Sequence, residues 1–376
     1  MLDEWIPEVA GSEIHDDPFN PISRFARETL AQDGDDTRIA WVHRSDRFYE
    51  KLATPDVTVA DLIGDVDPIK AANLKLSYAD DRVIHFGMIP RANRCIYVIN
   101  ELPDLQSRIQ VALFNILEEG DVQIRGFKVR LPLDVQFVFT ANPEDYTNRG
   151  SIVTPLKDRI GSQILTHYPE DLETARKITA QEAALDPAQE KGVTVPDMAR
   201  DLLEQISFEA RKSEYVDRKS GVSARMSITG YENLISTAER RMLRAGAERT
   251  TLRLSDFMGV LPAITGKIEL VYEGEQEGAD SVAEILVEEG VKTLFSRYFP
   301  EIKKLERKDA VSPYDDLVTW FFESDGLELP DDASDAQYQE ILKRATPLNN
   351  LIEKYLPDLD EAMVPYAKEI VLWGLV

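Results

Sequence analysis

The residues best suited to chemistry are Asn100 and Glu101, which directly follow an apolar run from Cys95 to Ile99. A short apolar run of this kind predicts a strand that is buried on both faces. Open α/β sheets bind ligands at the carboxyl ends of such strands. A nucleotide hydrolase needs a polar group near Mg²⁺ and a carboxylate that orients water. The same residues also fit a plain buried strand that ends in a surface glutamate, and this segment alone does not separate the two interpretations.

The residues that follow predict the elements that would position this pair. Gly120 is placed to cap the end of a helix, and residues 122–131 alternate apolar and polar side chains around Arg125-Gly126, which predicts a β-hairpin. The residues before Gly120 keep helical spacing: Leu105, Ile109, Ala112, Leu113, Ile116 and Leu117.

A second buried strand begins at Val135 and runs into Thr140-Ala141-Asn142-Pro143. The pair Asp158-Arg159 comes after it. The sequence therefore predicts an α/β core in which two strands end in polar residues.

Over residues 61–168 this chain resembles the AAA+ ATPases, and specifically the branch that holds the magnesium-chelatase ATPase subunit and the MoxR-like proteins. The ordered set of a Walker B strand, a helix, a hairpin, a strand ending in Asn and an Asp-Arg pair carries the resemblance. Residues 61–67 and 87–94 also look like this branch. The resemblance implies an α/β fold: a partial P-loop-type core, with a parallel sheet, flanking helices and a hairpin insert, then a helical lid and a helical C-terminal region.

The resemblance also implies roles for four residues. Glu101 is the Walker B base that polarises the attacking water, and Asn142 is sensor 1, which contacts that water or the γ-phosphate. Arg159 is the arginine finger, offered to the nucleotide of a neighbouring subunit, and Arg225 is sensor 2, which reaches the γ-phosphate from the lid. A carboxylate accepts a proton, an amide orients without titrating, and a guanidinium stabilises charge on a phosphoryl group.

Each of the last three has a plainer alternative. Asn142 stands before Pro143 and could only shape a turn. Arg159 could be the ion-pair partner of Asp158 or of another carboxylate. Arg225 could be an ordinary arginine at the start of a helix. These alternatives stay open from the sequence.

Two departures from the family pattern matter. Asn100 stands where the Walker B pattern usually has Asp, so we assign it to nucleotide and Mg²⁺ binding through a metal-bound water, without a negative charge. The sequence also has no Gly-x-x-x-x-Gly-Lys-Ser/Thr, the loop that cradles phosphates with backbone N–H groups and a lysine. The family's helix after that loop would lie near the chain's first residues. We therefore expect that a segment with the loop is missing before Met1, the alternative being a protein that truly lacks it.

The composition fits a soluble cytoplasmic protein. Of the 376 residues 43% are hydrophobic and 30% charged, and no apolar run or leader indicates a membrane span or signal peptide. The net charge of −25 disfavours partners that are nucleic acids or anionic membranes, and the basic residues Arg240, Arg241 and Arg244 are expected on a solvated helix face. The single cysteine, Cys95, is expected in the core.

We expect three domains: residues 1–168 as the α/β core without the phosphate loop, residues 169–265 as the helical lid, and residues 266–376 as a helical region. Residues 4–10 are interpreted as the remnant of a helix broken at Pro7, and residues 272–278 as an acidic connector. The aromatic cluster Trp320-Phe321-Phe322 fits a buried core better than a docking patch.

By this interpretation the chain is an AAA+ ATPase module that uses ATP and Mg²⁺, forms a homo-oligomeric ring, commonly a hexamer, and remodels an unidentified partner protein. One alternative is a non-hydrolysing scaffold or interaction protein that keeps the fold. Another is a metal-chelatase motor that works on a partner in porphyrin synthesis.

Overall fold

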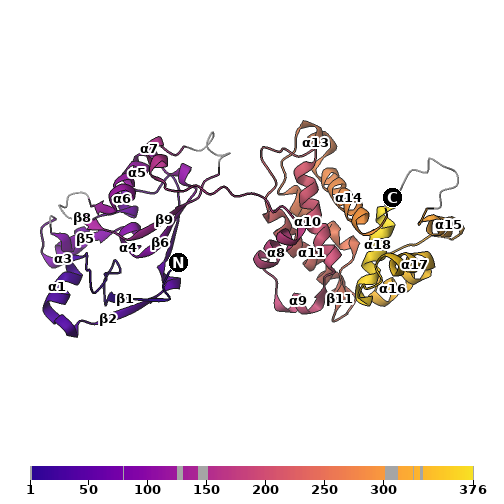
Figure 1. The fold of residues 1–376 in the computed structure, drawn as a ribbon, viewed down its shortest axis with the longest axis horizontal. Helices are drawn as coiled ribbons and strands as arrows, with labels where there is room; N and C mark the ends of the chain where they lie inside the picture. The colour runs from indigo at the N-terminus through magenta and orange to yellow at the C-terminus, as the bar shows by residue number, and fades with distance from the viewer. Residues whose placement is uncertain are drawn as a thin grey trace. The chain divides into compact units, whose positions relative to one another are not determined.

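The computed structural model describes residues 2–78, 80–124, 130–142, 151–300, 312–324, 326–330 and 333–375. The chain forms two compact units, Met1–Leu165 and Thr166–Val376 (Figure 1). In the described residues the first unit mixes helices and strands and the second is nearly all helical. The further division of the second unit into a lid and a C-terminal region stays a prediction. Among the described helices none is both long and apolar enough to cross a membrane.

A three-stranded parallel sheet lies at the centre of the first unit. Strand β6 (Cys95–Asn100) pairs on one side with β3 (Phe48–Leu52) and on the other with β9 (Val135–Phe139). Leu52 is opposite Asn100, and Ile99 is opposite Phe139, so all three strands end at the same edge. Tyr97 and Ile99 are fully buried, as expected for a central strand with both faces covered. The predicted α/β class is confirmed.

Short antiparallel pairs and helices surround this sheet. The pairs are β1 (Trp5–Val9) with β2 (Ile39–His43), β4 (Gly64–Val66) with β5 (Ile84–Phe86), and β7 (Asp121–Gln123) with β8 (Arg130–Pro132). The predicted hairpin is therefore confirmed in its pairing, while Arg125-Gly126 lies outside the described residues. The helices are α1 (Arg24–Asp33), α2 (Val59–Leu62), α3 (Pro68–Leu74), α4 (Met88–Arg91), α5 (Ser107–Ala112), α6 (Phe114–Glu119) and α7 (Thr154–Arg159).

Local sequence explains several of these boundaries. Thr58 and Asp61 form a capping box at the start of α2, and Asp67 caps α3 with Pro68 in its first turn. Gly120 ends α6 with a φ of 69°, the left-handed conformation expected of it. Cys95 is buried in the core, where burial raises the pKa of its thiol to about 11, so it serves packing.

The helix remnant expected near the N-terminus is wrong. Residues 5–9 form strand β1, paired with β2 from Trp5 opposite His43 to Val9 opposite Ile39. Ile6 and Val9 are buried, and Pro7, which lacks an N–H, is tolerated in a two-stranded sheet because each strand has an open edge. The burial of these apolar side chains therefore decides the conformation of this segment.

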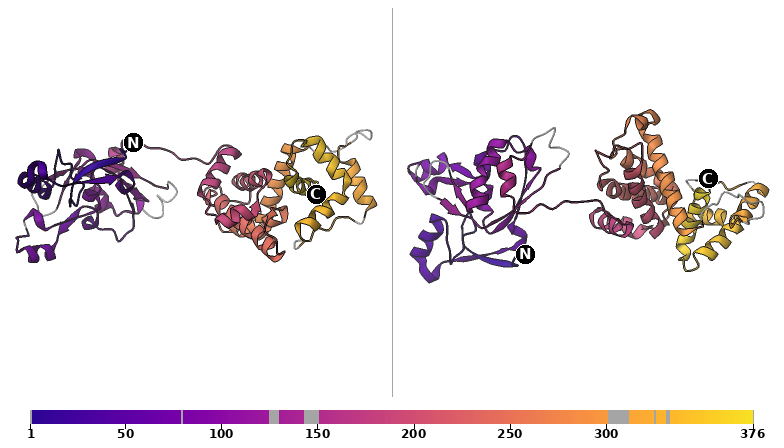
Figure 2. Two further views of the ribbon diagram at one scale, coloured as in Figure 1. Left: turned by 90° about the horizontal axis from the view of Figure 1, so that it is seen from below. Right: turned by 45° about the horizontal axis from the view of Figure 1, so that its top comes forward.

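The second unit packs most of its helices around a main hydrophobic core that extends from Val193 to Val371, and a smaller buried cluster holds Ala333, Tyr338 and Leu342. Figure 2 shows the helices of this unit from two further sides. Its elements are α8 (Leu172–Glu182), α9 (Pro187–Gly192), β10 (Val193–Thr194), α10 (Asp197–Lys212), α11 (Arg225–Arg244), β11 (Thr250–Thr251), η6 (Leu254–Val260), α12 (Leu261–Thr265), α13 (Tyr272–Glu277), α14 (Ala279–Tyr298), α15 (Asp315–Glu323), α16 (Asp335–Arg344), α17 (Thr346–Tyr355), η7 (Glu361–Met363) and α18 (Val364–Gly374).

Two expectations for this unit are wrong. Residues 272–277 form helix α13 instead of a connector, with Glu273 and Glu275 in the first turn, where the helix dipole favours carboxylates. In the aromatic cluster Phe322 is 87% and Phe321 36% exposed. Only Trp320 of that cluster packs against the core, as a partly buried residue.

Helix α14 is continuous across Gly290, where the apolar pattern is interrupted. A side chain there would meet α10, because a β-carbon would lie 3.0 Å from Ile206 Cγ1 and 3.2 Å from Leu202 Cδ1. The glycine therefore lets α10 and α14 approach each other closely.

A buried charged network joins the end of the chain to α11 and η6. The side chain of Arg241, which was expected on a solvated face, is only 9% exposed, and its Nη2 lies 2.8 Å from Asp256 Oδ2. The buried Arg253 donates to Asp335 Oδ1 at 2.7 Å, and Glu369 on α18 accepts the Leu254 N–H at 2.7 Å. Burial raises the pKa of Glu369 from its usual 4.5 to about 7, and the nearby Asp256 carboxylate adds to the rise.

Glu369 should make the second unit less stable as pH rises. Its folded-state pKa lies above its unfolded value, so the folded state holds the proton more tightly. The stabilisation is complete below about pH 4.5 and is lost as pH passes about 7, a change of about 3 kcal/mol from this group. Glu369→Gln should flatten that part of the pH profile of urea unfolding, followed by circular dichroism. The exposed control Glu353→Gln should leave it unchanged, and identical profiles for wild type and Glu369→Gln would contradict the assignment.

Candidate functional site

Polar side chains gather where the three parallel strands end. Asn100 Nδ2 donates to the Glu50 carboxylate of β3, and the Thr140 hydroxyl, just past β9, donates to Asn100 Oδ1 at 3.1 Å. Glu101 follows Asn100 directly. The structure therefore links one residue from β3, one from the end of β6 and one just past β9, with Asn100 in the middle.

The backbone of Glu101 is held in an uncommon conformation. Its φ of 55° and ψ of 49° lie in the left-handed region, which non-glycine residues seldom adopt. Thr140 fixes this turn from both its groups: its Oγ1 accepts the Glu101 N–H at 3.1 Å, and its carbonyl accepts the Leu102 N–H at 2.9 Å. Strain of this kind persists where the surroundings over-determine it, often at functional sites. The Glu101 side chain thus leaves the sheet edge in a direction that Thr140 sets.

Sequence reasoning missed both Glu50 and Thr140 as site residues. Thr140 carried a signal, because it directly follows the second buried strand. Glu50 carried none, because residues 48–52 alternate half-exposed and exposed side chains and do not stand out as a strand. Glu50 places a carboxylate beside Asn100, and so supplies at the strand ends the negative charge that the amide lacks.

Of the other sequence-predicted residues in the first unit, Arg159 takes no part in these hydrogen bonds. Asn142 is an exposed residue two positions past Thr140. Arg159, at the end of α7, donates from Nε to Glu118 Oε2 at 2.8 Å and from Nη1 to the Pro155 carbonyl at 2.8 Å. Its guanidinium also lies 5.0 Å from the Phe114 ring centroid. The structure thus gives Arg159 a carboxylate partner on α6.

Arg225 belongs to the second unit. It is the first residue of α11, its side chain is exposed, and its N–H donates to Ser223 Oγ at 3.2 Å. The predicted helix start is therefore confirmed, and its role as sensor 2 stays a prediction.

The oxygen atoms at the strand ends suit a hard cation such as Mg²⁺, which takes one or two carboxylates and completes its shell with water and phosphate oxygens. In the described ranges no group of three or more His, Cys, Asp or Glu residues could hold a metal ion by itself. One part of a Mg²⁺–nucleotide complex, the cation with its bound water, would fit beside the side chains of Glu50, Asn100 and Glu101. The phosphate cradle is the part for which the sequence offers no residues.

The sequence profile of the AAA domain (dynein-related subfamily) matches residues 37–160. No curated protein matches the chain. Similar solved structures include a putative ATPase from Cytophaga hutchinsonii, 18% identical, which covers 64% of this chain and 76% of its own with a TM-score of 0.26. The BchI–BchD complex of magnesium chelatase is 18% identical over 64% and 75%, with a TM-score of 0.31. NtrX from Brucella abortus in complex with ADP is 17% identical over 50% and 38%, with a TM-score of 0.32.

The matched residues contain the whole parallel sheet, the strand-end residues and Arg159. The resemblance drawn from the sequence is confirmed at the level of this domain, while the magnesium-chelatase and MoxR-like branch stays a prediction. Residues 37–160 of the chain match the AAA domain (dynein-related subfamily).

Proposed function

We propose that the chain is an AAA+ ATPase module of the magnesium-chelatase/MoxR-like branch, which couples ATP hydrolysis to the remodelling of a partner protein. The observation that carries the proposal is the strand-end cluster of Glu50, Asn100, Glu101 and Thr140 inside an AAA domain. A carboxylate held at a fixed direction beside amide and hydroxyl groups is what water activation needs.

In this proposal each residue of the cluster has a separate role in activating water or binding the cation. Glu101 accepts the proton of the attacking water, and Thr140 holds the backbone that aims it. Asn100, polarised between Glu50 and Thr140, orients a metal-bound water, and Glu50 adds negative charge for the cation. Bound Mg²⁺ supplies neutralisation of the phosphate charge.

The remaining roles follow the family. Asn142 contacts the water or the γ-phosphate, Arg159 reaches the nucleotide of the next subunit, and Arg225 contacts the γ-phosphate from the second unit. These contacts need a homo-oligomeric ring, commonly a hexamer, in which hydrolysis shifts the first unit against the second. The partner could belong to a metal chelatase.

The alternative is a scaffold that keeps the AAA fold and does not hydrolyse ATP. One observation favours it: the Arg159 guanidinium is engaged by Glu118 of its own chain. The two functions differ in nucleotide binding and turnover, which can be measured.

These 376 residues alone should bind ATP poorly, because the missing loop would provide backbone N–H groups and a lysine for the phosphates. Isothermal calorimetry of Mg²⁺–ATP should show a dissociation constant well above the micromolar range. The control is the loop-bearing chain, by which we mean this chain extended at its N-terminus by a strand, a Gly-x-x-x-x-Gly-Lys-Ser/Thr loop and the helix that follows such a loop; it should bind far more tightly. Micromolar binding by the 376 residues alone would contradict the expectation that tight binding needs the phosphate contacts of such a loop.

A further inference from the structure

The exposed aromatic residues of α15 border an apolar groove in the second unit. The groove has a volume of about 760 Å³ and is lined by side chains from α14, α15, α18 and the segment of residues 327–329. Phe322 is 87%, Val318 45% and Trp373 44% exposed. So much aromatic surface in water is unusual for a part of a protein without a partner.

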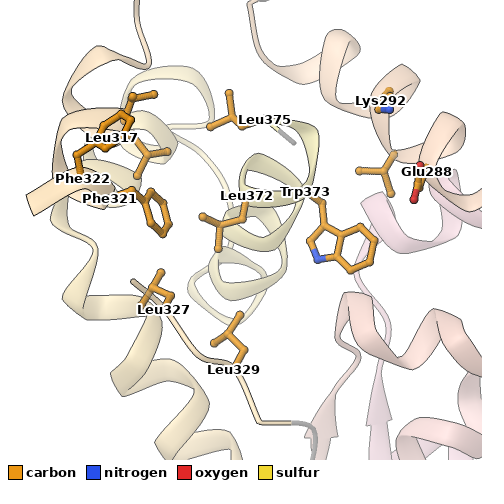
Figure 3. Close-up of a pocket in the computed structure, with 12 residues that line it drawn as sticks. Glu288, Lys292, Leu317, Phe321, Phe322, Leu327, Leu329, Leu372, Trp373 and Leu375 are labelled. Atoms are coloured by element: carbon orange, nitrogen blue, oxygen red, sulfur yellow. The ribbon is translucent and has the colours of Figure 1, made fainter. Parts of the chain in front are cut away.

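Figure 3 shows how the groove is built. Phe321 points from α15 toward Leu372 of α18, and Leu327 and Leu329 lie along the adjoining wall. Trp373 leaves the other side of α18 and faces Glu288 on α14. The floor is continuous with the core, because Leu317 is buried in it and Leu372 and Leu375 pack against it.

The charges beside this groove have one dominant sign. Lys292 is the cation among its lining residues, and Glu288 lines it beside Trp373. More exposed carboxylates stand next to the lining residues along the chain: Asp315, Asp316, Glu323 and Glu328. Within the described residues none of these carboxylates is in an ion pair with a side chain. A binding partner therefore gains by bringing positive charge.

We propose that this groove binds an amphipathic helix of a partner protein, with large apolar side chains along one face and Lys or Arg beside them. A helix satisfies its own backbone hydrogen bonds, which matters here because aliphatic and aromatic side chains offer none. A second copy of this chain would bring two acidic rims together, and an anionic membrane would repel them. The carboxylates thus select a basic helix over both.

The test uses the full chain and a fluorescein-labelled helical peptide with leucine at i, i+3, i+4 and i+7 and lysine at the flanking positions, followed by fluorescence anisotropy. Saturable one-to-one binding is expected, and Phe322→Asp should weaken it about tenfold or more, as for an aromatic anchor at an interface. Phe322 is so exposed that this change leaves the fold intact. The matched control is Leu243→Asp, at an exposed leucine on α11 of the same unit, which should bind as wild type does.

A second part of the experiment tests whether the carboxylates beside the groove select a basic peptide. Glu288→Lys should weaken binding of the lysine peptide several-fold, whereas Glu353→Lys on α17 should not, and a peptide with glutamate in place of lysine should bind at least tenfold more weakly to wild type. The proposal is overturned if the lysine peptide does not saturate, if Phe322→Asp and Leu243→Asp bind it equally, or if charge reversal at Glu288 has no effect. Self-association of the chain in sedimentation velocity that Phe322→Asp abolishes, or Phe322-dependent binding to vesicles of anionic phospholipid, would likewise overturn it.

Discussion

Glu101→Gln in the loop-bearing chain should abolish most ATP hydrolysis and leave ATP binding intact. The amide keeps the size and the hydrogen-bonding capacity of the side chain but cannot accept the water's proton, a loss worth roughly 10²–10⁴-fold in rate for an acid–base group. The fixed backbone at residue 101 depends on Thr140 and not on the carboxylate, so the geometry should survive. Binding is measured by calorimetry, and turnover by phosphate release at saturating ATP.

Two further substitutions distinguish the loss of the water-activating carboxylate from general damage to the protein. Glu4→Gln, at an exposed glutamate of the same unit, should turn over ATP at the wild-type rate. Asn100→Asp should also be tolerated, because it places the carboxylate usual in the family beside the proposed metal site. If Glu101→Gln hydrolyses ATP normally, Glu101 is not the water-activating base.

Arg159→Ala in the loop-bearing chain should lower turnover by about 10³–10⁵-fold if the guanidinium acts on the neighbouring subunit's nucleotide. Mixing Arg159→Ala subunits with Glu101→Gln subunits should then recover activity, because one kind of interface has both an intact Glu101 and an intact Arg159. Arg159→Lys should not recover it, because an ammonium lacks the planar fork of the guanidinium. Phosphate release from the mixed and the separate proteins gives the comparison.

The ion pair with Glu118 provides a further variant that distinguishes a role of Arg159 in the neighbouring subunit from a structural role. To reach another subunit the Arg159 guanidinium must leave Glu118, which it contacts through two nitrogens. Glu118→Gln should therefore keep or raise turnover if Arg159 acts in trans. If mixing restores nothing although both variants assemble, and Glu118→Gln and Arg159→Ala lower the melting temperature alike, Arg159 is a structural partner of Glu118.

The central strand and its neighbours could be predicted from sequence because their physical signal is local. The run before Asn100 is apolar on both faces, and Gly120 marks a helix end through its own backbone freedom. Strand β1 could not be predicted in this way, because its conformation depends on pairing with β2, some thirty positions further along the chain. The exposure of Phe322 likewise depends on which helices cover α15.

Some residues of the candidate site could likewise be predicted from sequence, and others could not. Asn100 and Glu101 stand out because they end a buried strand, and Thr140 ends the next one. Glu50 was missed because nothing in residues 48–52 marks a strand, and only the parallel register, with Leu52 opposite Asn100, brings it to Asn100. Sequence left the partner of Arg159 open between Asp158 and another carboxylate, and the packing of α7 on α6 gives Glu118.

In the proposed function, nucleotide is hydrolysed at the strand ends of the AAA domain that residues 37–160 match. The most direct test of this function is steady-state phosphate release by the loop-bearing chain at saturating Mg²⁺–ATP, measured beside Glu101→Gln under the same conditions. Sustained turnover is expected of the first protein and phosphate release near background of the second, with both fully bound to ATP. Tight ATP binding without turnover by the unsubstituted loop-bearing chain would contradict the proposed ATPase function and leave the scaffold function in its place.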